Sequence, residues 1–302
     1  MADKVPLKLV DNGSGIGSLV EFAVGDTVPA ANLTKAIAVA LTGLVAGTNT
    51  AIVVTDTILS ALQNLQAQTT AAIAYRTGSG YIDGLVPVWN SASSISVTSG
   101  SAYIPGLGAN LAVPAMLTLS GLTLTANTFY HLYLYSNAGV AAIELVTTVP
   151  SAPYSGSAIT KTGDTSRRYI GSVLTLAANT LAKFTQDGTR VSYLEFVAAT
   201  PFAVVGGTAT VATNVSCAAC VPVTSRYAGA VVTNNSTTAY VRISQPEQSV
   251  AVSSSAHQVS ITAGGLIAID LPLDSLQRFS YIMDVATTGA VTVRVYGYIY
   301  QR

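Results

Sequence analysis

From residue 84 onward, short runs of β-branched and aromatic residues alternate with Gly, Asn, Pro and Ser. Runs of about four to eight such residues between turn formers are typical of strands, and their regular spacing is typical of antiparallel sandwiches. The expected strands are 84–89, 94–97, 101–104, 116–119, 129–135, 141–146, 168–175, 190–195, 203–205, 209–211, 228–233, 239–244, 258–262, 266–271, 281–285 and 290–300. The sequence therefore predicts a mainly β protein with two antiparallel β-sandwich-like domains, 72–196 and 197–302.

Two expected strands carry most of the aromatic residues. Run 129–135 alternates Leu132 and Leu134 with larger rings, and either face fits a core. In run 290–300, a period of two places four residues on one face, a candidate surface for a ligand or partner: Arg294, Tyr296, Tyr298 and Tyr300. Tyrosine rings stack on the apolar faces of sugars, so this face suits a carbohydrate or a protein. The alternative is packing within the core, because Tyr is a common strand residue.

Residues 34–71 are expected to form a helical, coiled-coil shaft. Thr55 and Asp56 are good helix-start residues. An apolar stripe follows at four-, three- and four-residue spacing: Ile58, Leu62, Leu65 and Thr69. A stripe this narrow is typical of a short coiled coil, which predicts a homotrimer with Ile58, Leu62 and Leu65 as its seam. A single amphipathic helix packed on its own β-domain is the alternative.

Residues 1–33 are expected to form an extended arm. Its apolar side chains, with Leu7, Leu9 and Phe22 as candidate docking residues, are too few to bury a core. The Gly-rich run 13–17 lacks the preceding strand and the following Lys-Ser or Lys-Thr helix of a phosphate loop. No cofactor is therefore expected.

The small number of charged residues and the zero net charge limit the classes of partner that the chain could bind. Charged residues make up 9% of the 302, and the formal net charge is zero. Binding to phosphates needs clustered Lys and Arg, so no nucleic-acid partner is expected. Weak charge protection against association favours ordered self-assembly. The longest apolar stretch, 36–46, is about half the ~20 residues that span a bilayer, so no membrane insertion is expected, and the first residues do not form a signal peptide.

The side chains typical of catalytic and metal sites are sparse. Cys217 and Cys220 lie between strand-like and turn-like residues, which favours small buried or loop cysteines over a redox or metal site. His131 and His257 lack metal-ligand spacing to them. The acidic residues are scattered through turn-like contexts, as in Asp26, Asp83, Asp164, Asp187 and Asp274. The sequence therefore predicts no metal site and no enzyme.

Segment 161–193 concentrates the scarce charges at strand edges. It contains an Arg-Arg-Tyr-Ile-Gly-Ser step at 167–172, a Thr-containing run, and Phe-Thr-Gln-Asp-Gly before Arg-Val-Ser-Tyr. This order resembles a domain of bacteriophage tail-fibre and related virion proteins. The arm and the helical phrase 55–68 resemble the segments that precede fibre β-domains. The charges of Arg167 and Arg168 are expected to be solvated strand ends or subunit contacts.

The resemblance implies a structural protein of the virion, made in the host cytoplasm. Its arm would bind other virion proteins, and its β-domains would face a glycan or protein of the host surface. The expected function is a trimeric tail fibre or fibre segment that attaches the particle to its host. A capsid or collar decoration protein is the alternative, and a polysaccharide-degrading tailspike is a more remote one.

Overall fold

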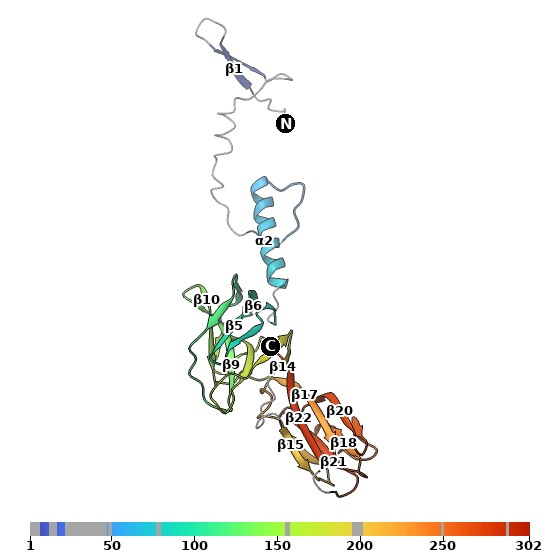
Figure 1. Cartoon of the computed structure of the whole chain (residues 1–302). Coiled ribbons are helices and arrows are strands. Elements are labelled where there is room, and N and C mark those ends of the chain that lie inside the picture. The colour runs from blue at the N-terminus through green and yellow to red at the C-terminus, as the bar shows by residue number, and fades with distance from the viewer. Residues whose placement is uncertain are drawn as a thin grey trace. The chain divides into compact units, whose positions relative to one another are not determined.

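The computed structural model describes residues 7–11, 17–21, 47, 50–76, 80–154, 158–194, 202–248, 251–287 and 290–302. Contacts divide the chain into two compact units, Met1–Ala74 and Tyr75–Arg302. The described chain is mainly β, with one helix and several antiparallel sheets (Figure 1), which confirms the coarse fold prediction. The second unit contains both expected β-domains.

The first unit contains a hairpin and the beginning of the helix. Strands β1 (Leu7–Asp11) and β2 (Gly17–Glu21) pair antiparallel. Helix α2 (Ile58–Arg76) begins after Thr57, whose Oγ1 accepts a hydrogen bond from the Ser60 amide at 3.1 Å. Thr57 is therefore the N-cap, later than the expected start at Thr55 and Asp56. The part of the expected shaft at 34–46 lies outside the described residues.

Three sheets form the first lobe of the second unit, which we define as strands β3 to β12. One sheet is β3 (Ile82–Gly84), β6 (Gly100–Ile104) and β7 (Ala109–Val113). Another is β4 (Pro87–Ser91), β5 (Ser94–Val97) and β8 (Leu117–Leu119). The third has the order β10 (Val140–Val146), β9 (Phe129–Asn137), β12 (Asp164–Leu174) and β11 (Thr160–Lys161).

Strand β9 is buried on both faces. Leu132 and Leu134 are fully buried, and His131 and Tyr133, which alternate with them, are buried as well. Strand β9 lies between β10 and β12 in its sheet, and both of its faces are covered. The sequence left open which face of this strand forms the core, and in the structure both faces do.

Arg168 corrects one expectation about the charged segment. Its side chain is fully buried, and its guanidinium donates to the carbonyl oxygens of Ile159 at 3.2 Å and Gly80 at 3.4 Å. Burial, with a smaller effect of the Arg302 charge, lowers the pKa of Arg168 to about 10. Arg167 instead lies over the Tyr135 ring, 3.9 Å from its centroid. Arg168 therefore connects β12 to the backbone at Ile159 and Gly80 inside the protein, since a buried cation needs polar partners.

The second lobe, strands β13 to β22, has two sheets. The larger contains β13 (Phe184–Asp187), β14 (Arg190–Tyr193), β22 (Val291–Tyr300), β17 (Ser225–Asn234) and β20 (Leu266–Pro272), with β15 (Phe202–Gly207) also paired to β22. The smaller has the order β16 (Thr213–Ser216), β21 (Arg278–Met283), β18 (Val241–Ser244) and β19 (Val259–Ile261). Both contribute to one buried cluster, consistent with a β-sandwich. The expected strand at 209–211 is wrong, because that segment is irregular and the strand begins at Thr213.

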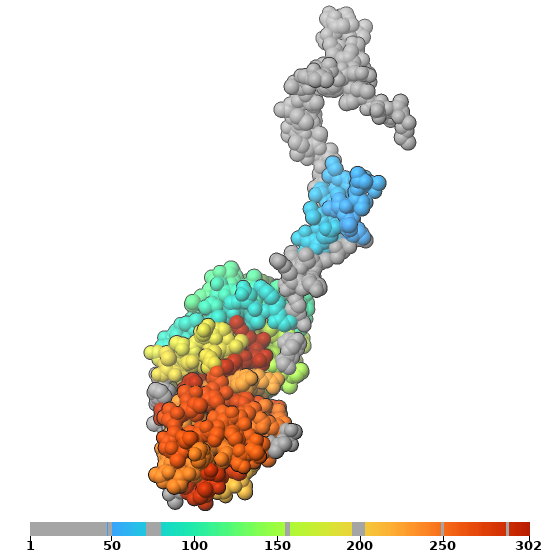
Figure 2. All heavy atoms as spheres, turned by 90° about the vertical axis from the view of Figure 1, so that its right-hand side faces the viewer, coloured from blue at the N-terminus to red at the C-terminus, as the bar shows by residue number. Residues whose placement is uncertain are grey.

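The larger sheet contains strands from both sides of residue 197, the expected domain boundary. Strand β22 pairs with β14 through Arg190↔Ile299 and Ser192↔Gly297, and with β17 along most of its length. In Figure 2 the red atoms at the C-terminal end lie beside yellow and cyan ones, and the Arg302 guanidinium donates to the Leu85 carbonyl at 3.1 Å. The last strand therefore joins the two lobes.

Candidate functional site

Helix α2 carries a stripe of exposed apolar residues. Ile58, Leu62 and Leu65 are 82%, 38% and 49% exposed. Segment 50–54 adds further exposed apolar side chains at Ile52 and Val54. The expected seam is therefore an apolar stripe that the described residues leave open, a surface suited to another apolar surface.

The candidate docking arm is described only in part. Leu7 and Leu9 lie on β1, opposite Glu21 and Leu19 of β2. Phe22 lies outside the described residues. The prediction that the arm docks on other virion proteins stays a prediction.

The predicted surface on the last strand is split by a β-bulge. Gly229 is opposite Gly297, but the next residue of β17, Ala230, is opposite Val295, so Tyr296 is an extra residue on β22. A bulge shifts the alternation of side chains by one position. Arg294 and Tyr296 are therefore out of phase with the two later tyrosines, and the expected single face is wrong.

Tyr298 and Tyr300 belong to the core. Each is 1% exposed, and their hydroxyls donate to the carbonyls of Ser172 at 2.6 Å and Ile170 at 2.9 Å on β12. The Tyr298 ring also meets Phe129 edge-on, with centroids 6.4 Å apart. Neither ring can stack on a ligand. The core-packing alternative describes both residues, and their hydrogen bonds tie the last strand to the first lobe.

A chain of buried polar side chains continues this junction. His131 Nδ1 lies 2.8 Å from the Ser172 hydroxyl, which lies 2.7 Å from the Tyr169 hydroxyl, which lies 2.9 Å from Thr224 Oγ1. Burial lowers the pKa of His131 to about 4, so the imidazole is neutral at pH 7. Each group has a partner and lies away from solvent, so the chain acts as a structural link between lobes.

The two cysteines lie in a buried turn. The Cys220 amide donates to the Cys217 carbonyl at 2.7 Å, and the Tyr193 hydroxyl donates to the Cys220 carbonyl at 2.8 Å. No disulfide joins the two thiols, and burial raises their pKa values, to about 12 for Cys217 and about 11 for Cys220. Thiols with raised pKa values are poor nucleophiles and poor metal ligands. The expected small buried cysteines are confirmed.

Several of the described acidic residues serve local structure. The Asp274 carboxylate is fully buried and accepts hydrogen bonds from the Leu276 and Arg278 amides and from Arg278 Nε. The Asp164 carboxylate accepts from the Ser166 hydroxyl at 2.6 Å. Among the described residues, no group of three or more His, Cys, Asp or Glu side chains could hold a metal ion.

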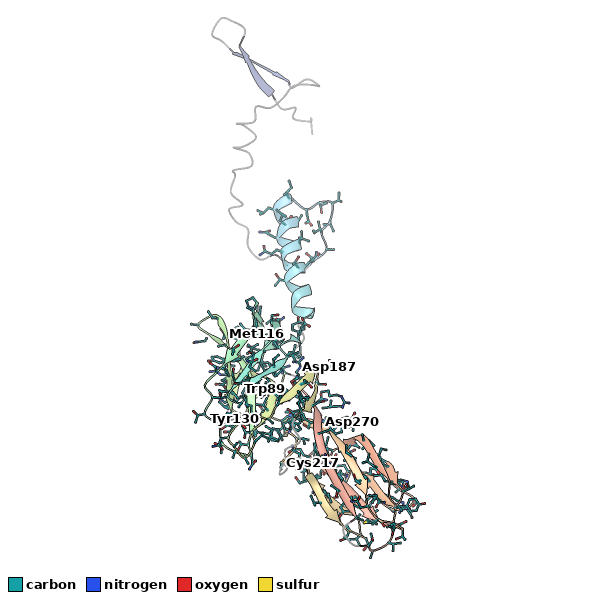
Figure 3. All side chains as sticks on the ribbon, viewed as in Figure 1. Trp89, Met116, Tyr130, Asp187, Cys217 and Asp270 are labelled. Carbon is teal, nitrogen blue, oxygen red and sulfur yellow. The ribbon has the colours of Figure 1, made fainter. Side chains whose placement is uncertain are left out.

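The sequence reasoning missed a groove between β4 and β13, with a volume of about 350 Å³. Its lining residues are Val86, Pro87, Val88, Trp89, Lys183, Phe184, Thr185, Gln186 and Leu194. Trp89, labelled in Figure 3, is half-buried at this groove and is the only tryptophan in the chain. That single tryptophan was the available signal, but its partner strand β13 was not among the expected strands.

The described helix is not long and apolar enough to cross a membrane. No family model matches the chain, and neither curated proteins nor solved structures show significant similarity to it.

Proposed function

We propose that this protein is a structural component of a bacteriophage virion, a trimeric tail fibre or fibre segment that attaches the particle to its host. The observation that carries the proposal is the open apolar stripe of α2, formed by Ile58, Leu62 and Leu65. The resemblance of the helical phrase and of segment 161–193 to fibre proteins supports it.

The physical argument for three copies starts from the helix. Its 19 residues make about 28 Å of helix, and isolated helices of this length are marginal in water. The stripe has coiled-coil spacing, so identical helices can cover it by meeting along a common axis. Each copy would then bury the same three side chains, and the helix would gain packing along its apolar stripe.

The arm and the β unit suit the two kinds of contact that an attachment protein makes. In this proposal the hairpin β1–β2 and its neighbouring residues bind other virion proteins. The β unit faces the host, and its extensive buried core suits a protein that must survive outside the cell. With only 9% charged residues, its surface is built largely from hydroxyls, amides and backbone, which suits contacts by hydrogen bonding.

Light scattering on the purified full chain tests the assembly. A trimer has three times the 30.9 kDa mass of the chain, and it should persist at micromolar concentration. A stable monomer at that concentration contradicts the trimer.

Competition for adsorption tests the attachment. Purified protein at saturating concentration should bind host cells and reduce adsorption of the phage. Unchanged adsorption favours the alternative, a capsid or collar decoration protein without receptor binding. Release of new reducing ends from host surface polysaccharide would instead indicate a polysaccharide-degrading tailspike.

A further inference from the structure

The groove between β4 and β13 has the size and the lining of a small-ligand site. Ligand sites in proteins measure roughly 300–1,000 Å³ and combine apolar walls with a few polar groups. The volume of about 350 Å³ lies at the small end of that range. Val86, Val88 and Leu194 contribute apolar surface, whereas Lys183 and Gln186 contribute polar atoms. The groove therefore has room for one or two sugar-sized rings.

Trp89 gives the groove a flat aromatic surface. Its indole nitrogen donates to the Leu181 carbonyl at 3.4 Å, which orients the ring. The ring is half-buried, although burying it completely would stabilise the fold. Tryptophan combines a large apolar face with a polar edge, and its few rotatable bonds make ordering it inexpensive. An oriented, partly open indole beside a groove suits the apolar face of a pyranose ring.

Lys183 places a positive charge next to that ring. Its Nζ lies 5.2 Å from the centroid of Trp89, close enough for a cation–π interaction. Within the described part of the chain, Lys183 has no carboxylate at ion-pair distance, and the groove lining contains no acidic residue. The ammonium group therefore offers its charge to an anion that the described residues do not supply there.

Gln186 and Thr185 place neutral polar groups at the groove. The Gln186 amide nitrogen donates to the Gly188 carbonyl at 2.8 Å and to the Tyr300 hydroxyl at 2.9 Å. With both amide protons used, the side chain is held in one orientation and its oxygen is the remaining polar atom, an acceptor. The exposed Thr185 hydroxyl can donate or accept. Sugar hydroxyls match both groups.

We propose that this groove binds a short acidic saccharide of the host surface. One sugar ring lies against Trp89, its carboxylate pairs with Lys183, and its hydroxyls bind Gln186 and Thr185. A single lysine is too little charge for a nucleic acid, whose backbone needs several cations. The inference rests on the proposed attachment function, because it identifies which part of the protein would meet the host and what chemical class of molecule it would bind.

The lone tryptophan gives a direct assay. Titration of the full chain with trigalacturonate and with α2,8-linked sialic acid trimer, followed by intrinsic tryptophan fluorescence, reads only this position. We expect saturable changes with at least one of the two, weakened by salt because the carboxylate–ammonium contact is partly open to solvent. The methyl ester of the same saccharide should bind more weakly, since it lacks the charge.

Substitutions then locate the binding by calorimetry. Trp89→Ala should weaken binding about tenfold or more, the effect of losing one aromatic contact. Lys183→Gln should weaken binding of the acid but leave binding of its methyl ester unchanged. Tyr240→Ala is the matched control, because Tyr240, like Trp89, is an aromatic ring beside a cation, with Arg242 5.7 Å from its centroid, but it does not line the groove. It should bind like the unchanged protein.

The possible outcomes separate this inference from the proposed function. The groove assignment is overturned if the protein binds neither saccharide. It is also overturned if binding persists in a Trp89→Ala variant whose circular dichroism is unchanged. If Trp89→Ala still competes fully for adsorption, the attachment function stands and the host contact lies elsewhere. If the saccharide binds through Trp89 but the protein does not compete for adsorption, the groove assignment stands and the attachment function fails.

Discussion

Helix α2 and the β unit cover their apolar side chains in different ways. In the β unit, the core residues of both lobes form one buried cluster, and even polar side chains such as His131 and Ser172 find partners inside it. In the helix, Ile58, Leu62 and Leu65 remain open. The β unit can therefore reach its stability as a single chain, whereas the stripe on the helix needs a partner surface to be covered.

The largest expected effect is complete loss of assembly when the stripe is charged. Leu62→Asp with Leu65→Asp places unpaired carboxylates in the proposed seam, where burial without a partner costs several kcal/mol. Light scattering should then give the mass of one chain. The unfolding transition of the β unit should not move, because none of its core residues is changed.

Gln66→Asp is the control for this pair. Gln66 is exposed on the same helix, outside the stripe, so a carboxylate there should leave the mass unchanged. A double variant that keeps the mass of the unchanged protein would show that the stripe is not the interface.

The second effect tests how strongly the last strand ties the lobes together. Tyr298→Ala removes a ring that is 1% exposed and should cost about 3–5 kcal/mol in the free energy of unfolding, measured with urea. Tyr298→Phe keeps the ring and should lose only about 1 kcal/mol with the hydrogen bond to the Ser172 carbonyl.

Tyr296→Ala is the matched control on the same strand. Tyr296 is only half-buried, so its replacement by Ala should lower the free energy of unfolding by at most about 1 kcal/mol. If Tyr296→Ala and Tyr298→Ala lower the free energy of unfolding equally, the two rings do not lie on opposite faces of the sheet.

The last strand also shows where reasoning from the sequence succeeds and where it stops. Its existence follows from the run of Val, Arg and Tyr residues, and β22 (Val291–Tyr300) agrees with the expected 290–300 within one residue. The bulge at Tyr296 does not follow, because the register depends on β17, a strand some sixty positions earlier. A strict period of two therefore assigned all four residues to one face, whereas Arg294 and Tyr296 lie on one face and Tyr298 and Tyr300 lie on the other.

The groove and the buried polar chain were beyond the sequence for a related reason. Trp89 and Lys183 lie far apart in the chain, and only the packing of β13 beside β4 makes them neighbours. Similarly, His131 meets Ser172 through the pairing of β9 with β12. The helix was easier, since a stripe at Ile58, Leu62 and Leu65 depends on local spacing alone. Local patterns predicted elements, but not the contacts between distant strands.

The third effect is an acid sensitivity that belongs to the β unit. The pKa of His131 falls from 6.5 in an unfolded chain to about 4 in the fold because of burial. The unfolded state therefore binds the proton first, and stability is intact above pH 6.5 and is lost as the pH falls toward 4. Lowering the pH from 7.5 to 4.5 should therefore reduce the contribution of His131 to the free energy of unfolding by about 2–3 kcal/mol.

His131→Gln isolates that contribution from the carboxylates that titrate in the same range. Glutamine can still meet the Ser172 hydroxyl but takes up no proton. Urea unfolding at both pH values should show a smaller loss for the variant than for the unchanged protein. If the variant and the unchanged protein lose the same free energy of unfolding, His131 is not the acid-sensitive group. If acid destabilises the helix and not the β unit, the acid sensitivity belongs to the other region.

The smallest effect concerns an ion pair on the larger sheet of the second lobe. Arg190 on β14 donates to the Asp270 carboxylate on β20 at 2.9 Å, across two intervening strands. Arg190 lies opposite Ile299 of β22, whereas Asp270 lies opposite Gly229 of β17, so the arginine side chain reaches diagonally across the two strands. The two side chains are 43% and 34% exposed, so the pair should contribute less than about 1 kcal/mol.

A double-mutant cycle of Arg190→Ala and Asp270→Ala measures this coupling directly. We expect a small value that shrinks further in high salt, because solvent-exposed charges are screened. A coupling well above 1 kcal/mol would mean that the β unit, like the helix, depends on contacts at its surface as well as on its core. The contrast between a self-sufficient β unit and a partner-dependent helix would then need a different physical basis from the burial of apolar side chains.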